Sequence, residues 1–181
     1  MLKKILIGFG IFILLAAGAL AYLNNRNRTL SPPGEAELTV GDLAVRVEYS
    51  RPSVRGRLVF GTEAEGALQP YGKYWRLGAN EPTKLIVNKD FQFEGKAVAA
   101  GTYDMYAVPG ANSFIINLNK DDRFWGYTEP DYLNDVVSVS VPVTKSEIGV
   151  EQFTITIIEE EGAAKLVFMW ANSVWSVKIT E

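Results

Sequence analysis

Two irregular stretches of the chain carry the side chains that could bind a ligand. They are YSRPSVRGRLVFG (49–61) and QPYGKYWRLGANEPTK (69–84). Guanidinium groups, aromatic rings, an amide, a carboxylate and a hydroxyl occur together there, and this combination suits a planar, anionic or sugar-like ligand. The candidate ligand-binding residues are Arg51, Arg57, Tyr71, Trp75, Arg76, Asn80, Glu81 and Thr83.

The same residues also fit a purely architectural role. Arg76 and Glu81 could form a salt bridge that closes a tight corner, and Trp75 could belong to the core. Asn80 could hydrogen-bond the turn backbone, and Gly78 could supply a positive φ. Both interpretations stay open at the level of sequence.

The absence of His and Cys from the 181 residues limits the chemistry available. It excludes a Ser-His-Asp triad, a His-ligated zinc site, thiolate chemistry and disulfides. We predict no metal site and no cofactor, and no catalytic residue is identified. A hydrolase acting on glycans remains an alternative because a glycosidase needs only two carboxylates. The best-placed acids for it are Glu63, Glu65, Glu81 and Asp104. A structural or protein-interaction domain is a third interpretation.

The elements that must position these residues are short β-strands. Apolar residues alternate with polar ones in LAVRVEY (43–49), FIINLN (114–119), VSVSVPV (137–143) and FTITI (153–157). This period of two, with Gly, Pro, Asn and Asp clusters between the runs, predicts an all-β fold. We expect an antiparallel β-sandwich or partly open barrel of about nine or ten strands. The acidic run EEEGAA (159–164) predicts a solvated hairpin loop, and KLVFMWA and VWSVKIT, on either side of Asn172-Ser173, predict a closing hairpin.

The N-terminus predicts a membrane segment. Two lysines precede an uncharged run from Ile5 to Tyr22. As a helix this run would span about 27 Å, close to the thickness of a bilayer's hydrocarbon core. We expect a single-pass anchor with the domain on the extracytoplasmic side. The alternative is secretion after signal cleavage near Ala21. The expected organisation is an anchor or signal segment (1–28), a linker (29–37) and an extracytoplasmic β domain (38–181).

The charge of the domain bears on its partners. Four of the 18 basic residues and none of the 21 acidic ones lie in residues 1–28, so the remainder carries a net charge of −7. An acidic domain repels phosphate backbones, and we therefore expect no nucleic-acid partner. The expected partners are the membrane and a small-molecule or glycan ligand. Nothing in the sequence indicates an oligomeric state.

Four segments together resemble the bacterial domain-of-unknown-function family numbered 2911. They are YSRPSVRGRLVFG, YGKYWRLGANEPTKL, GKAVAAGTYDMYAVP and VEQFTITI, and the resemblance covers roughly residues 38–158. Members are mostly exported or membrane-anchored proteins with no established activity. The resemblance implies that two irregular elements define the domain, and the matching residues are Ser50, Arg51, Pro52, Gly56 and Arg57 in one, and Trp75, Arg76, Gly78, Ala79, Asn80, Glu81 and Thr83 in the other. The chain departs from a common exported form because it has no Cys for lipid attachment.

Overall fold

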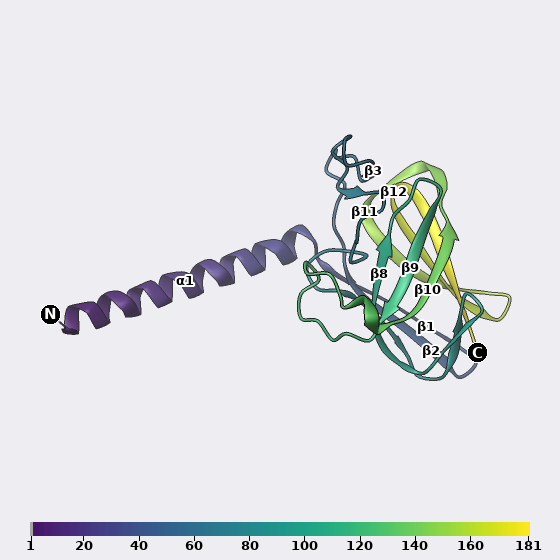
Figure 1. Ribbon diagram of the computed structural model, residues 1–181, viewed down its shortest axis with the longest axis horizontal. Coiled ribbons are helices and arrows are strands. Elements are labelled where there is room, and N and C mark those ends of the chain that lie inside the picture. Colours follow the sequence, from purple (N-terminus) through teal and green to yellow (C-terminus); the bar gives the residue numbers. More distant parts are fainter. Residues whose placement is uncertain (1) are drawn as a thin grey trace.

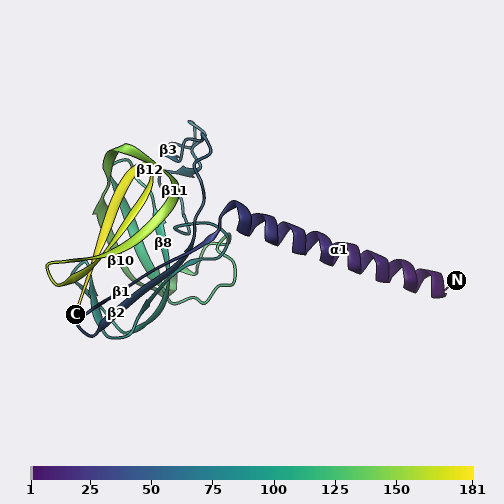
Figure 2. The ribbon, with the colours of Figure 1, turned by 180° about the vertical axis from the view of Figure 1, so that it is seen from behind.

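The computed structural model describes residues 2–181 and consists of a β domain with one projecting helix (Figure 1). Helix α1 (Leu2–Leu30) points away from the domain in both side views (Figures 1 and 2). Most of its side chains are exposed, and it is long and apolar enough to cross a membrane. Strand β1 begins at Pro33, with two residues between it and the helix, so residues 33–37 of the expected linker pair with the next strand.

Two antiparallel sheets form the domain and confirm the all-β prediction. The larger sheet has six strands, in the order β1 (Pro33–Val40), β2 (Leu43–Ser50), β5 (Thr83–Val87), β8 (Gly101–Val108), β9 (Ser113–Asn119) and β10 (Asp135–Pro142). The smaller sheet has four, in the order β11 (Thr144–Glu160), β12 (Ala163–Thr180), β6 (Phe91–Phe93) and β7 (Lys96–Val98). A parallel pair of two-residue strands, β3 (Phe60–Gly61) and β4 (Gln69–Pro70), and a 3₁₀ turn, η1 (Tyr132–Asn134), complete the elements.

The alternating residues face an aromatic core between the sheets. In β2 the buried apolar residues are Leu43, Val45, Val47 and Tyr49, as the period of two predicts. In the centre of the core, Trp75 stacks on Trp170 with ring centroids 5.5 Å apart, and Trp175 stacks on Phe168 at 5.4 Å. Burial of such large rings is the main driving force for joining the two sheets.

The prediction of a closing hairpin at Asn172-Ser173 is wrong. One continuous strand, β12, runs through these residues and pairs with β11 on one side and β6 on the other. Ala171 has a φ of 49°, and the buried positions change there from even numbers, ending with Trp170, to odd numbers, from Ser173 onward. A local irregularity of this kind shifts the side-chain alternation without turning the chain. The predicted hairpin loop in EEEGAA is confirmed, with positive φ at Glu161 and Gly162.

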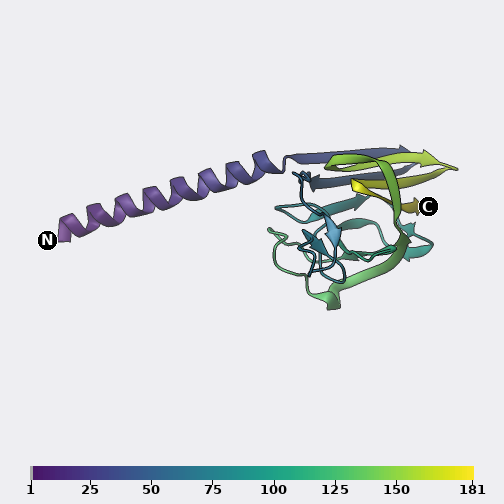
Figure 3. The same ribbon diagram turned by 90° about the horizontal axis from the view of Figure 1, so that it is seen from above.

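The sandwich is closed on one side by contacts between side chains and backbone. The Tyr49 hydroxyl donates to the Ile155 carbonyl oxygen at 3.2 Å and accepts from the Ile155 amide at 2.9 Å. Beyond the end of β2, Ser53 forms an isolated bridge with Gln152 of β11. Figure 3 shows β1 and β11 along the same side of the domain, which α1 enters from one end.

Candidate functional site

The candidate site is built around the corner formed by residues 75–84, and Trp75 fixes that corner to the core. The Trp75 amide donates to the Ala107 carbonyl at 2.8 Å, and the Ala107 amide donates back at the same distance. Its indole Nε1 donates to the Gly78 carbonyl oxygen at 3.2 Å. The ring is almost fully buried, so Trp75 contributes its area to packing between the sheets.

Backbone contacts hold the rest of the corner in shape. Asn80 has a φ of 59°, a left-handed conformation that Asn tolerates better than most residues. The buried Thr83 hydroxyl donates to the Leu77 carbonyl at 2.6 Å. At Gly78 any Cβ would lie 2.7 Å from the Ser50 carbonyl oxygen, so the backbone of the corner can approach β2 only with Gly there.

Arg76 and Glu81 do not pair with each other. The Arg76 guanidinium donates to the Asn80 carbonyl at 3.2 Å and lies over the ring of Tyr127, 5.8 Å from its centroid. Within residues 2–181 Arg76 has no carboxylate within ion-pair distance, and burial lowers the pKa of its guanidinium. Arg76 therefore connects the corner to the loop that carries Tyr127.

Glu81 instead forms an ion pair with Arg28, near the end of α1. Its neighbour Asn80 donates from its side-chain amide to the Ser31 carbonyl at 3.3 Å, in the junction between α1 and β1. Arg55 adds a hydrogen bond from its guanidinium to the Leu30 carbonyl at 3.2 Å. The corner thus contacts the segment through which the helix enters the domain.

An open groove of about 500 Å³ lies at this junction. Its walls come from the end of α1, from β1 and β2, and from the corner, and the lining residues are Arg28, Pro33, Gly34, Glu35, Glu48, Tyr49, Ser50, Glu81, Pro82 and Lys84. Arg46, on the same outward face of β2 as Glu48, binds two of the acids, with nitrogen–oxygen distances of 2.6 Å to Glu35 and 2.7 Å to Glu48. The groove therefore presents carboxylates and cations side by side, beside a partly apolar floor.

Most of the other candidate residues do not line this groove. Arg51 donates to the Phe153 carbonyl at 3.3 Å and to the Thr154 hydroxyl at 3.1 Å, and its stem packs against the groove residue Gly34. Arg57 folds back on its own loop, with bonds to the Ser53 and Val54 carbonyls. Tyr71 is half-buried against the core. Of the eight candidates, only Glu81 lines the groove, while Asn80 contacts the junction beside it.

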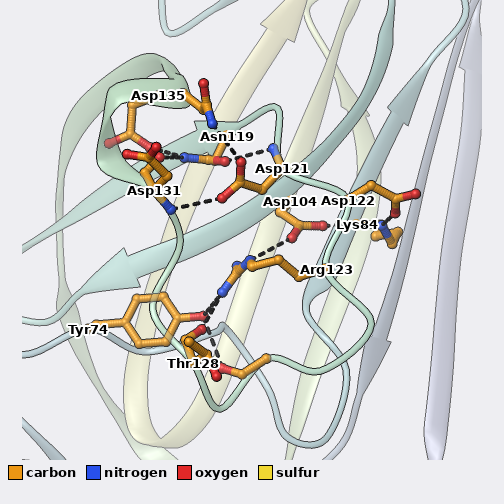
Figure 4. Close-up of polar contacts among 12 residues, drawn as sticks. Tyr74, Lys84, Asp104, Asn119, Asp121, Asp122, Arg123, Thr128, Asp131 and Asp135 are labelled. Carbon is orange, nitrogen blue, oxygen red and sulfur yellow. Dashed lines mark hydrogen bonds and ion pairs between the residues drawn. The ribbon is translucent and has the colours of Figure 1, made fainter.

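A buried polar network lies beside the corner and includes its last residue, Lys84 (Figure 4). The Asp104 carboxylate in β8 is fully buried and accepts from Lys84 Nζ at 3.2 Å and from Arg123 Nε at 3.0 Å. Arg123 also donates to the Tyr74 hydroxyl at 3.1 Å, and Lys84 binds the exposed Asp122 at 2.9 Å. Complete burial raises the pKa of the Asp104 carboxyl, and the two cations oppose that rise. Burial likewise raises the pKa of Tyr74, against the effect of Arg123.

Sequence reasoning missed the partners of Asp104 because they lie far apart along the chain. Asp104 itself was a candidate acid, but Arg123 lies in the loop between β9 and β10, a segment without any periodic pattern. The same loop is held at its base by Asp121, whose carboxylate accepts from the Asp131 amide at 2.8 Å and from the Asn134 side chain at 2.7 Å. The one signal in the sequence was a charged residue in the middle of an otherwise apolar strand, GTYDMYAV. Among residues 2–181 no group of His, Cys, Asp or Glu is arranged to hold a metal ion.

The fold and the groove define this chain as an antiparallel β-sandwich domain that follows an apolar N-terminal helix able to serve as a membrane anchor or signal segment. Residues 31–179 match the family described as "Protein of unknown function (DUF2911)". The chain belongs to that family, and the resemblance inferred from the sequence motifs is confirmed. No significant match to the chain was found among curated proteins or among solved structures.

Proposed function

We propose that the chain is a single-pass membrane protein whose extracytoplasmic domain binds a hydroxyl-rich envelope component, such as a glycan, in the groove at the helix junction. The observation that carries this proposal is the position of Glu81 in the groove wall opposite Arg28. A carboxylate and a guanidinium that contact each other at a solvent-open surface can exchange that contact for hydroxyl groups of a ligand at small cost, because exposed ion pairs contribute little.

The composition of the groove supports a polar, uncharged ligand. Three acids line it, and Lys84 and Arg28 stand among them, so a ligand with one strong charge would meet repulsion as well as attraction. A polyol can donate to the carboxylates and accept from the cations, and its apolar ring face can pack on the exposed Pro33. The domain would then hold the ligand close to the membrane surface.

Hydrolysis of a bound glycan is the second candidate, since Glu35 and Glu48 line the same groove as Glu81. A glycosidase needs one carboxyl that donates a proton and another that acts as nucleophile or base. All three groove acids are already bound by arginine, Glu81 by Arg28 and the other two by Arg46. Binding is therefore the function that this arrangement supports best.

Glu81→Gln tests the proposal, with Glu63→Gln as the matched control. Glu63 is exposed on the loop between β3 and β4, away from the groove, and pairs only loosely with Lys73 at 3.7 Å. The full chain in detergent is mixed with a panel of envelope oligosaccharides, and bound species are counted by native mass spectrometry. We expect wild type and Glu63→Gln to bind the same oligosaccharide, and Glu81→Gln to bind it about tenfold more weakly, a change of about 1.4 kcal/mol.

A Glu81→Gln variant that keeps the wild-type melting temperature but binds more weakly would show that Glu81 contacts the ligand rather than stabilising the fold. We expect an almost unchanged melting temperature because an exposed ion pair contributes only about 0–1 kcal/mol. Equal binding by wild type and Glu81→Gln, or no bound species with any oligosaccharide, would contradict the proposed binding site. Release of shortened oligosaccharides by wild type and not by Glu81→Gln would instead favour the hydrolase.

A further inference from the structure

The loop between β9 and β10 exposes a group of large apolar side chains. Leu133 is 91% exposed, Phe124 86% and Tyr127 77%. In residues 33–181 the only other large apolar residue exposed to this degree is Ile148, at 78%. Single exposed apolar residues are common on soluble domains, but several in one loop indicate a surface that contacts something apolar.

This loop lies at the end of the domain from which α1 leaves. It is the green segment on the side of the domain where the helix ends in Figures 1 and 3. Contacts connect the two: the Gly126 amide donates to the Asn80 carbonyl at 2.9 Å, and Tyr127 lies under Arg76. Since the corner in turn binds Arg28 through Glu81, the loop and the helix are attached to the same ten-residue corner, residues 75–84.

The length of the helix brings this end of the domain close to a bilayer. The apolar run ends at Tyr22, and the eight following residues of α1 rise about 12 Å beyond the hydrocarbon boundary. The headgroup layer on each side of the core is about 5–8 Å thick, and tilt of the helix lowers the domain further. Side chains that project from this end of the domain therefore have only about 4–7 Å left to cover before they enter the interface, where aromatic residues are favoured.

The loop presents its apolar side chains from a fixed base. Arg123, directly before Phe124, is held by the buried Asp104, and Leu133 lies in the η1 turn capped by Asp131, whose carboxylate accepts from the Leu133 amide at 3.0 Å. The loop is thus held at both ends before any contact forms, which lowers the entropic cost of binding. The loop carries more acids than bases, so attraction to anionic lipid does not contribute.

We infer that Phe124, Tyr127 and Leu133 form a second membrane contact, which enters the headgroup region beside α1 and fixes the orientation of the domain on the bilayer. This inference rests on the proposed membrane anchoring. Because the contact is apolar, we expect it in purely zwitterionic lipid and at high salt. It would hold the groove at a constant height above the lipid.

Site-specific fluorescence of the full chain tests this contact, and the absence of Cys allows single labels. Leu133→Cys, Leu14→Cys and Asp42→Cys are labelled with a nitrobenzoxadiazole dye and reconstituted in phosphatidylcholine vesicles. Leu14 lies within the apolar run, and Asp42 lies in the turn after the eight-residue β1, about 26 Å from the helix junction. We expect spin-labelled lipid to quench the dye at residues 133 and 14 and to leave it unchanged at residue 42.

The outcomes separate the contact from the anchor. Quenching at residue 14 without quenching at residue 133 would overturn the second contact and leave the anchor intact, as would be the case if the loop bound a protein. Quenching at neither position would overturn both. Adding Phe124→Ser and Tyr127→Ser to Leu133→Cys should reduce quenching at residue 133 and leave it unchanged at residue 14. Equal quenching with and without these substitutions would show that the dye, rather than the loop, enters the lipid.

Discussion

Replacement of Asp104 by Asn removes one charge from the buried network and leaves the shape of the side chain. The carboxylate has no exposed area and accepts from Lys84 at 3.2 Å and from Arg123 at 3.0 Å. An Asn side chain can accept from only one of them and turns an N–H group toward the other. Removing one partner of a buried pair costs about 3–5 kcal/mol.

The structure places Asp104→Asn at the lower end of that range. Lys84 is 25% exposed and keeps its bond to Asp122, and Arg123 keeps its bond to Tyr74. Burial also raises the pKa of the Asp104 carboxyl, so the charged form is already less favourable there than in water. We therefore expect a loss of about 3 kcal/mol, which corresponds to a fall in Tm of about 6–12 °C for a domain of this size.

Asp122→Asn is the matched control because Asp122 binds the same Lys84 but is 96% exposed. Its melting temperature should stay close to that of wild type, because solvent screens an exposed ion pair. Both variants are unfolded as full chains in detergent and followed by tryptophan fluorescence, since Trp75, Trp170 and Trp175 lie in the core. Hydrogen exchange should show loss of protection at the Gly126 amide in Asp104→Asn alone. Equal melting temperatures for the two variants would refute the reasoning that burial makes the Asp104 pair decisive for the loop.

Two further predictions concern pH and membrane orientation. Burial and the hydrogen bond to Asp135 raise the pKa of Tyr106 in the folded chain, so its stabilising contribution is complete below about pH 10 and is lost as pH rises further. Urea unfolding between pH 8 and 11 should show this loss of stability. Tyr106→Phe should be less stable than wild type at pH 8 by about 1 kcal/mol, but its free energy of unfolding should change less with pH. A variant with the same pH profile as wild type would contradict the assignment. For orientation, Glu161→Cys in the exposed β11–β12 turn should react with a membrane-impermeant maleimide on intact cells. Reaction only after lysis would show that the domain lies on the cytoplasmic side. If the helix is an uncleaved anchor, the mass of the purified chain should include residues 1–21.

Much of the sandwich follows from local patterns. Residues that alternate along a strand point to opposite faces, so the buried set in β2, β10 and the central part of β11 could be assigned from the sequence. The error at Asn172-Ser173 arose because polar residues within a strand look the same whether the chain turns or bulges. Only the neighbouring strands decide, and here β11 pairs with β12 both before and after the irregularity, while β6 pairs with its last residues.

The candidate site was less accessible to sequence reasoning, and Glu81 shows why. Lys84 lies three residues away in sequence and Arg76 five, yet the partner of Glu81 is Arg28, 53 residues away. Contacts of this kind depend on where the helix enters the domain, which no periodicity describes. The same holds for Asp104, whose partner Arg123 lies in an irregular loop.

The sequence by itself determined the all-β class, the apolar N-terminal segment, the absence of His and Cys chemistry and the family, because each depends on composition or on short-range order. Tertiary structure decided that Trp75 lies in the core, that Glu81 pairs with Arg28 in the lining of the groove, and that the loop between β9 and β10 lies at the same end of the domain as α1. The physical reason is that burial and pairing depend on distances in space between segments far apart in the chain. Local preferences fix the faces of strands, but only packing of the sheets, loops and helix fixes those distances.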